Sequence, residues 1–160
     1  MNNSKSNSRQ LACIMFTDIV GYTALMGEDE NLALSVLEKN RKIQWPIIES
    51  YGGTIIKELG DGLLATFYSA TDSVLAAASI QLAVKNEKHL TLRIGLHLSE
   101  VIFENNDVFG DGVNIASRIE SSAPVGSIYI SEAVQKNLSN KKGIETKYIV
   151  YVVKPKWTFC

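Results

Sequence analysis

The sequence lacks the features that mark several specialised classes of protein. Its two cysteines, Cys13 in an apolar run and Cys160 at the last position, are too few for a disulfide framework or a thiolate metal site. Sixteen lysines and arginines nearly balance 17 aspartates and glutamates, which leaves no broad positive surface for nucleic acid or an anionic membrane. We therefore expect Cys13 to be a core residue and any contact with phosphate groups to be local.

Long apolar segments are also missing. No stretch is long and apolar enough to span a bilayer, and the opening residues MNNSKSNSRQ lack the apolar centre of a signal peptide. We therefore expect a cytoplasmic protein without a membrane segment. With 160 residues, 46% of them hydrophobic, the chain suits a single domain, which we place at residues 11–160 after a polar tail at residues 1–10.

Hydrophobic periodicity predicts strands and helices in mixed order. We expect strands at 11–17, 90–103 and 126–131, a hairpin of two strands within 54–67, and helices at 30–50, 70–86 and 109–122. Glycines in Gly60-Asp61-Gly62 supply the backbone angles of a tight hairpin turn, and Pro46 is expected to kink the first helix. This order predicts an α+β fold, a ferredoxin-like sandwich of a mostly antiparallel sheet with helices.

Two aspartates stand where strands of this predicted sheet end. Asp18 follows the first strand, and Asp61 lies at the tip of the hairpin. A ferredoxin-like fold sets these strands side by side, so both carboxylates are expected at one edge of the sheet. Neighbouring carboxylates repel each other unless a cation lies between them, and magnesium prefers such oxygen ligands. The structural alternative is a turn aspartate and a helix-capping aspartate, both common in any fold.

The predicted helix at 109–122 carries a second candidate group. Asn114 and Arg118 are four residues apart and so share one helix face. An amide and a guanidinium projecting together suit a phosphoryl group, because arginine matches phosphate oxygens in a fixed fork and keeps its charge. A solvated helix face explains the same two residues without any function.

Four motifs in this order resemble the class III nucleotidyl cyclases, which make cyclic AMP or cyclic GMP. They are FTDIVGYT, IIKELGDGLLATF, RIGLHLSEV and DVFGDGVNIASRIE, and the resemblance runs from about residue 11 to about residue 132. The resemblance implies that Asp18 and Asp61, with the main-chain carbonyl of Ile19, hold two divalent ions, Mg²⁺ or Mn²⁺. It also implies that Gly21 lets the backbone and the substrate phosphates approach closely.

The same resemblance assigns the base and the reacting groups. Lys57 and Asp107 occupy the positions that distinguish adenine from guanine, and a lysine there favours ATP because guanylyl cyclases carry an acid instead. Asn114 is expected to orient the ribose, and Arg118 to neutralise charge on the α-phosphate. The implied protein is an adenylate cyclase that works as a homodimer, with each site taking metals from one chain and Lys57, Asp107, Asn114 and Arg118 from the other.

The sequence also departs from the family pattern. Ser99 replaces a common glycine, a change expected to stiffen or crowd the local strand. The C-terminal segment YVVKPKWTFC is atypical; Lys154 and Lys156 are the candidates there for the triphosphate-binding lysine of the family, and neither aligns clearly with it. A catalytically weak domain that binds nucleotide or dimerises is therefore an alternative function, and a diguanylate cyclase is a more distant one because YGGT lacks an acidic motif. We interpret His89 and His97 as structural, since both lie in strand-like stretches without partners at metal-ligand spacing.

Overall fold

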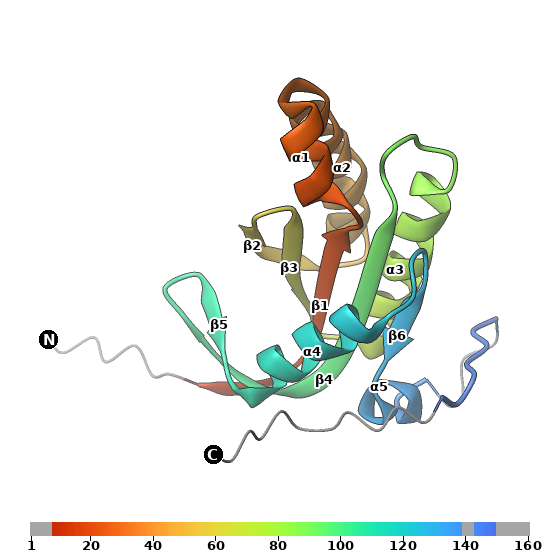
Figure 1. The fold of residues 1–160 in the computed structure, drawn as a ribbon. Coiled ribbons are helices and arrows are strands. Elements are labelled where there is room, and N and C mark those ends of the chain that lie inside the picture. The colour runs from red at the N-terminus through yellow and green to blue at the C-terminus, as the bar shows by residue number, and fades with distance from the viewer. Residues whose placement is uncertain (1–7, 139–142, 150–160) are drawn as a thin grey trace, which may run out of the picture.

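A computed structural model describes residues 8–138 and 143–149 of the chain (Figure 1). The strands are β1 (Arg9–Ile19), β2 (Thr54–Leu59), β3 (Gly62–Phe67), β4 (Leu92–Glu104), β5 (Asp107–Phe109) and β6 (Ile128–Ile130). The helices are α1 (Tyr22–Glu28), α2 (Glu30–Ser50), α3 (Ala70–Val84), α4 (Asp111–Ser122) and α5 (Glu132–Lys136). No helix in the described part of the chain has both the length and the apolar character needed to cross a membrane.

The strands form one sheet in the order β2-β3-β1-β4-β5, with β6 paired to β4. All pairings are antiparallel except the parallel one between β4 and β6. β1 and β4 are the longest strands and pair along the full length of β1, from Arg9 opposite Ile102 to Ile19 opposite Leu92. The α+β fold with a mostly antiparallel sheet is confirmed.

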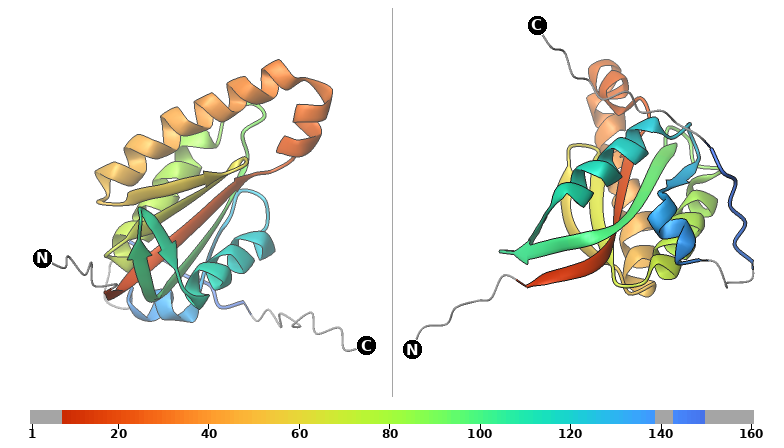
Figure 2. Two further views of the ribbon diagram at one scale, coloured as in Figure 1. Left: turned by 90° about the vertical axis from the view of Figure 1, so that its left-hand side faces the viewer. Right: turned by 90° about the horizontal axis from the view of Figure 1, so that it is seen from below.

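Helices cover both faces of the sheet (Figure 2). One core cluster lies on the side of α2 and α3 and contains Cys13 and Met15 of β1, while a second cluster contains Ile14 and Phe16 together with Ala116 of α4. Alternate residues of β1 therefore enter different cores, which explains why LACIMFT is an unbroken apolar run rather than an alternating one.

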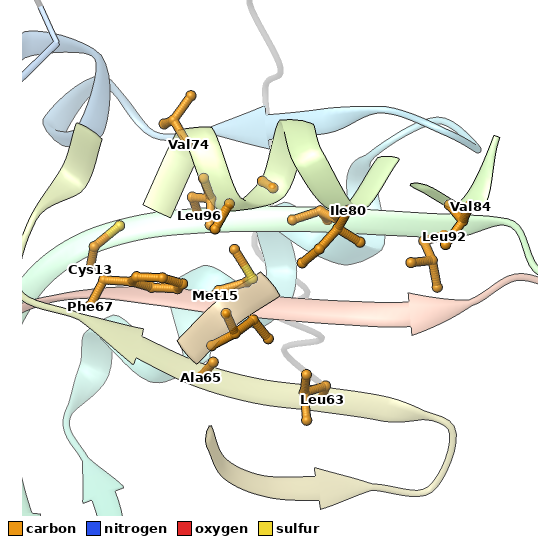
Figure 3. Packing of buried hydrophobic residues seen from close by; sticks show 14 of the residues in the cluster. Cys13, Met15, Leu63, Ala65, Phe67, Val74, Ile80, Val84, Leu92 and Leu96 are labelled. Carbon is orange, nitrogen blue, oxygen red and sulfur yellow. The ribbon is translucent and has the colours of Figure 1, made fainter. Parts of the chain in front are cut away.

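Cys13 lies in the first of these cores, beside Phe67 and Met15 (Figure 3). Its side chain is fully buried, and the Sγ atom is 2.9 Å from the Ser73 hydroxyl oxygen. Burial disfavours the thiolate and raises the pKa of Cys13 to about 11. The expectation that Cys13 is a core residue is confirmed.

Some local details differ from the sequence-based expectations. Helix α1 was not predicted; it is short, has no fully buried residue and starts after Gly21, whose φ is 75°. α2 continues through Pro46 to Ser50, and Gly52 follows it with a φ of 76°. His89 is not in a strand, because it lies in the loop before β4 with a φ of 61°. β1 begins at Arg9, two residues before the predicted apolar run.

Candidate active site

The structure brings Asp18 and Asp61 together at one end of the central strands. Asp18 is the penultimate residue of β1, because the strand continues to Ile19 and does not end before Asp18 as expected. Asp61 lies in the two-residue turn between β2 and β3. The backbone N–H of Ile19 donates a hydrogen bond of 3.1 Å to Oδ2 of Asp61, which joins the hairpin tip to β1. At Gly62 a Cβ atom would lie only 2.9 Å from the carbonyl oxygen of Thr17, so a larger residue would push the hairpin away from this position.

The electrostatics around these carboxylates fit a cation. Burial raises the pKa of Asp61, and the negative charge of Asp18 raises it further, against hydrogen bonds from backbone N–H groups that lower it. Oδ1 of Asp18 is buried and has no hydrogen-bond partner among the described residues. Within that same part of the chain no group of three or more histidine, cysteine or acidic residues could hold a metal ion. A pair of carboxylates suits Mg²⁺ or Mn²⁺ only when substrate phosphates or water complete the coordination.

A third acid, Glu120, lies against Asp18 and was missed by reasoning from the sequence. Glu120 is in the last turns of α4 and is 6% exposed. Burial raises the pKa of Glu120 to about 7, and the charge of Asp18 and a hydrogen bond with its carboxylate contribute in the same direction. Arg93, opposite Asp18 on β4, lowers the pKa of Glu120 by its positive charge. The group therefore holds three acids and one guanidinium.

Close helix packing delivers Glu120 to this position. A Cβ atom at Gly95 of β4 would overlap the backbone nitrogen of Glu120, so only glycine allows α4 to lie this near to the sheet. At the other end of the helix a Cβ atom at Gly112 would overlap the side chain of Ser99. The expected crowding at Ser99 is therefore accommodated by a glycine on the facing helix.

Lys57 and Asp107 also meet in the folded chain. Nζ of Lys57 donates a hydrogen bond of 2.9 Å to Oδ2 of Asp107, joining β2 to β5. This bond and one from the N–H of Val108 lower the pKa of Asp107, which keeps its carboxylate ionised and able to accept hydrogen bonds. Asp107 lines a cavity of about 470 Å³, together with Ile56 of β2 and Phe103 of β4.

A β-bulge sets the direction of Lys57. The register of β2 on β3 runs from Ile55 opposite Ala65 to Lys57 opposite Leu64, so Ile56 is an extra residue. The bulge places Lys57 level with Leu64, whose side chain packs in the core on the α4 side of the sheet. Bulges are frequent next to active sites because they redirect a side chain in this way.

Asn114 and Arg118 lie on a different face of α4 from Glu120, the residue that packs against Asp18. Both are exposed on α4, while Ala116 and Glu120 are buried on the opposite face. Within residues 8–138 and 143–149, the side chains of Asn114 and Arg118 form no hydrogen bond and no ion pair. Their shared, exposed face agrees with the helical spacing of the sequence.

Comparison with known proteins assigns the family. The profile that describes the adenylate and guanylate cyclase catalytic domain matches residues 4–154. The chain belongs to this family. This cyclase domain is 34% identical over 136 residues to an adenylate cyclase of Streptomyces coelicolor; the match covers 81% of the chain and 34% of that enzyme. The domain thus spans about a third of the length of this curated relative.

Solved structures of related domains carry both activities in their names. The cyclase domain has a TM-score of 0.77 and 33% identity to an adenylate/guanylate cyclase/hydrolase from Silicibacter pomeroyi, covering 82% of this chain and 81% of that one. Against the guanylyl cyclase Cya2 the TM-score is 0.75 and the identity 26%, with 82% and 79% of the two chains covered. Family membership alone therefore leaves the choice between ATP and GTP to individual residues.

Two residues of the cyclase domain that the sequence-based interpretation missed could have been found from periodicity. Gly112, Ala116 and Glu120 are spaced by four, so Glu120 is an acid on the buried stripe of an amphipathic helix. Arg93 shares a strand face with Gly95, which marks it as a charged residue directed toward α4. The other uncertain positions, Lys154 and Lys156, lie outside the described residues.

Proposed function

We propose that this domain is an adenylate cyclase that converts ATP to 3′,5′-cyclic AMP and pyrophosphate. The observation that carries this proposal is the ion pair between Lys57 and Asp107, 2.9 Å apart, with Asp107 on the wall of a cavity. Adenine has an acceptor at N1 and an exocyclic amine, which match a lysine donor and a carboxylate acceptor. Guanine has the reverse pattern, a donor at N1 and an acceptor at O6, so this pair disfavours GTP.

The ion pair does not use up the hydrogen-bonding capacity of either group. Lysine has three N–H donors, and an ionised carboxylate accepts at two oxygens, each with two lone pairs. Lys57 can therefore keep Asp107 as a partner while it donates to adenine N1, and Asp107 can accept from the exocyclic amine at the same time. The mutual contact then fixes both groups before the nucleotide arrives.

The proposed metal site consists of Asp18, Asp61 and the main-chain carbonyl of Ile19. The orphaned Oδ1 of Asp18 and the raised pKa of Asp61 support it, since both indicate carboxylates that gain from a cation. When bound, two Mg²⁺ or Mn²⁺ ions supply a lowered pKa for the ribose 3′-hydroxyl and offset charge on the triphosphate. The two carboxylates fix where that positive charge lies.

In the proposed reaction the ribose 3′-oxygen attacks the α-phosphorus, and the proton of the 3′-hydroxyl is released to water. A new P–O bond forms as the bond to the pyrophosphate oxygen breaks in line with it, and no covalent intermediate with the protein is needed. Asn114 would orient the ribose by hydrogen bonding. Arg118 would neutralise charge around the α-phosphate, where a guanidinium can use two parallel N–H donors.

The exposed positions of Asn114 and Arg118 support a homodimer with shared sites. Both side chains face solvent on α4 without partners among the described residues, although they would have to contact the substrate. A second copy related by two-fold symmetry could supply them to the aspartates of its partner, which gives two equivalent sites.

The test is an assay of the purified protein with ATP or GTP and Mg²⁺ or Mn²⁺, with the products separated by chromatography. We expect cyclic AMP, formed only with a divalent ion, and nearly complete loss of turnover in a folded Asp61→Ala protein. Full turnover by that variant would exclude the proposed metal site. Nucleotide binding without turnover in the parent protein would instead favour the catalytically weak alternative.

A further inference from the structure

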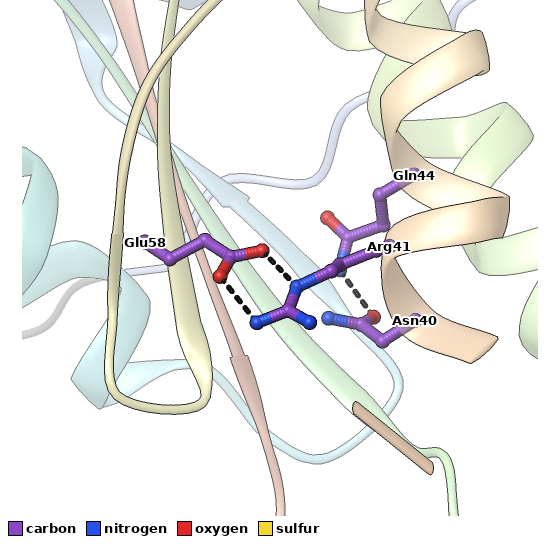
Figure 4. Close-up of polar contacts among 4 residues, drawn as sticks. All are labelled: Asn40, Arg41, Gln44 and Glu58. Atoms are coloured by element: carbon purple, nitrogen blue, oxygen red, sulfur yellow. Dashed lines mark hydrogen bonds and ion pairs between the residues drawn. The ribbon is translucent and has the colours of Figure 1, made fainter. Parts of the chain in front are cut away.

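The side chain of Arg41 reaches from α2 to the hairpin that carries Lys57 and Asp61. Its Nε donates to Oε1 of Glu58 at 2.7 Å, and its Nη2 donates to Oε2 at 2.8 Å (Figure 4). Two parallel bonds between a guanidinium and a carboxylate fix the relative orientation of the groups as well as their distance. The pair therefore constrains how β2 lies against α2.

Glu58 occupies a sensitive place in the hairpin. It directly follows Lys57 in β2 and precedes the hairpin aspartate Asp61 by three residues. Its partner in the sheet is Leu63 of β3. Among the strands of the described residues, β2 lies at the edge of the sheet and pairs with β3 alone. The bulge at Ile56 further interrupts the ladder between these two strands. Side-chain bonds therefore supplement the ladder in holding β2: Lys57 bonds to Asp107 of β5, and Glu58 bonds to Arg41 of α2.

The same turn of α2 also contacts the strand that carries the other aspartate. Gln44, buried beside Arg41 on the helix, accepts a hydrogen bond of 3.1 Å from the hydroxyl of Thr17, the residue before Asp18. Gln44 is itself held by a hydrogen bond to Asn40 on the preceding turn (Figure 4). One helical turn thus connects to β1 next to Asp18 and to β2 close to Asp61.

We propose that Arg41 is a positioning residue, whose paired hydrogen bonds to Glu58 hold Lys57 and Asp61 at the spacing that the active site requires. This inference rests on the proposed cyclase function, because only that function requires a defined spacing between Lys57 and Asp61. Arg41 does not touch the reacting atoms. Loss of the Arg41–Glu58 pair is expected to lower turnover more than it lowers the free energy of unfolding. Exposed ion pairs stabilise folds weakly, whereas small displacements of reacting groups greatly reduce the reaction rate.

The chain offers a matched control on the same helix. Lys39 forms an ion pair of 2.9 Å with Glu87, which joins α2 to the segment after α3 and does not involve the hairpin. Both pairs are formed by partly exposed side chains. Lys39→Gln therefore removes a comparable tether of α2, and Arg41→Gln removes the one to the hairpin.

The experiment compares the full-length parent, Arg41→Gln and Lys39→Gln by amide hydrogen exchange. In Arg41→Gln we expect exchange in residues 54–67 to become about two- to fivefold faster, the range that loss of an exposed pair can supply. Mn²⁺ binding measured without nucleotide should weaken, and ATP turnover should fall roughly tenfold or more. Lys39→Gln should match the parent in all three measurements, with a similar melting temperature for all proteins.

Two further variants test whether the effect comes from the pair itself. Arg41→Lys keeps the charge but loses the planar fork, so we expect only partial recovery of exchange protection and turnover. The double variant that reverses the pair, Arg41→Glu with Glu58→Arg, should show more exchange protection and more turnover than either Arg41→Glu or Glu58→Arg alone. If Arg41→Gln equals Lys39→Gln in hairpin exchange and Mn²⁺ affinity, the positioning role is wrong. A parent protein without cyclase activity would overturn the proposed function only, because hydrogen exchange tests the tether without turnover.

Discussion

Replacement of Glu120 by glutamine should stabilise the metal-free protein at alkaline pH. The carboxyl group of Glu120 is buried against Asp18, and its pKa is raised from 4.5 to about 7. Between these two values the folded protein holds a proton that the unfolded chain has released. Stability therefore falls as pH rises through this window, and the loss is complete above about pH 7. Glutamine is uncharged at every pH and avoids this loss.

The size of the effect follows from the shift in pKa. A shift from 4.5 to about 7 corresponds to roughly 3 kcal/mol of lost stability once Glu120 is ionised. The positive charge of Arg93 already reduces this repulsion, and glutamine has its own cost of burial, so the net gain in Glu120→Gln should be about 1 to 3 kcal/mol. Near pH 4.5 the parent carboxyl is protonated in the folded state, and the two proteins should differ little.

The assay is urea unfolding in the presence of a chelator, at fixed protein concentration and at several pH values from 4.5 to 8.5. Exposed Glu100 on β4 provides the control, because Glu100→Gln changes the same net charge without affecting the buried group. We expect the stability difference for Glu120→Gln to grow with pH and that for Glu100→Gln to stay small. A constant difference across the pH range, or a less stable glutamine protein at pH 8, would refute the assignment of a buried acid repelled by Asp18.

Further predictions concern base selection, site sharing and packing. Lys57→Glu should lower ATP turnover and narrow the preference for ATP over GTP, since mispaired polar groups cost about 1 to 3 kcal/mol each; competition assays measure the ratio. Asp18→Ala and Asn114→Ala should each be nearly inactive, yet a mixture should regain up to about half the activity per dimer if subunits exchange. If mixed dimers are shown to form and remain inactive, the sites are not shared between subunits. Gly95→Ala should lower the free energy of unfolding by about 1 to 3 kcal/mol, because its Cβ overlaps the α4 backbone.

Much of the framework was predictable because it depends on local patterns. The apolar run before Asp18 and the glycines around Asp61 specify a strand end and a hairpin tip, and sheet pairing then brings the two carboxylates together. The four-residue spacing of Asn114 and Arg118 likewise places them on one exposed helix face. These expectations needed only periodicity and turn chemistry, which act over a few residues.

The remaining features depend on contacts between distant segments. Helix α1 is too short to show a period, and its start depends on the positive φ of Gly21. The bulge at Ile56 changes the face of the sheet on which the side chain of Lys57 lies. The sequence pattern of the strand does not show that Ile56 is an extra residue in the pairing. The four-residue spacing places Glu120 on the buried stripe of α4, but its contact with Asp18 requires that α4 approach β4 at Gly95, which is a matter of tertiary packing.

Helix α4 has two faces with different partners, and this arrangement bears on the proposed dimer. Its buried face ends at Glu120 against Asp18 of the same chain, while its exposed face carries Asn114 and Arg118. If these exposed residues serve the site of a partner subunit, one rigid helix contacts the metal carboxylate of one site and the reacting phosphate of the other. A displacement of α4 caused by repulsion at Glu120 would then disturb both sites of a dimer at once, so the two sites should lose activity together rather than independently.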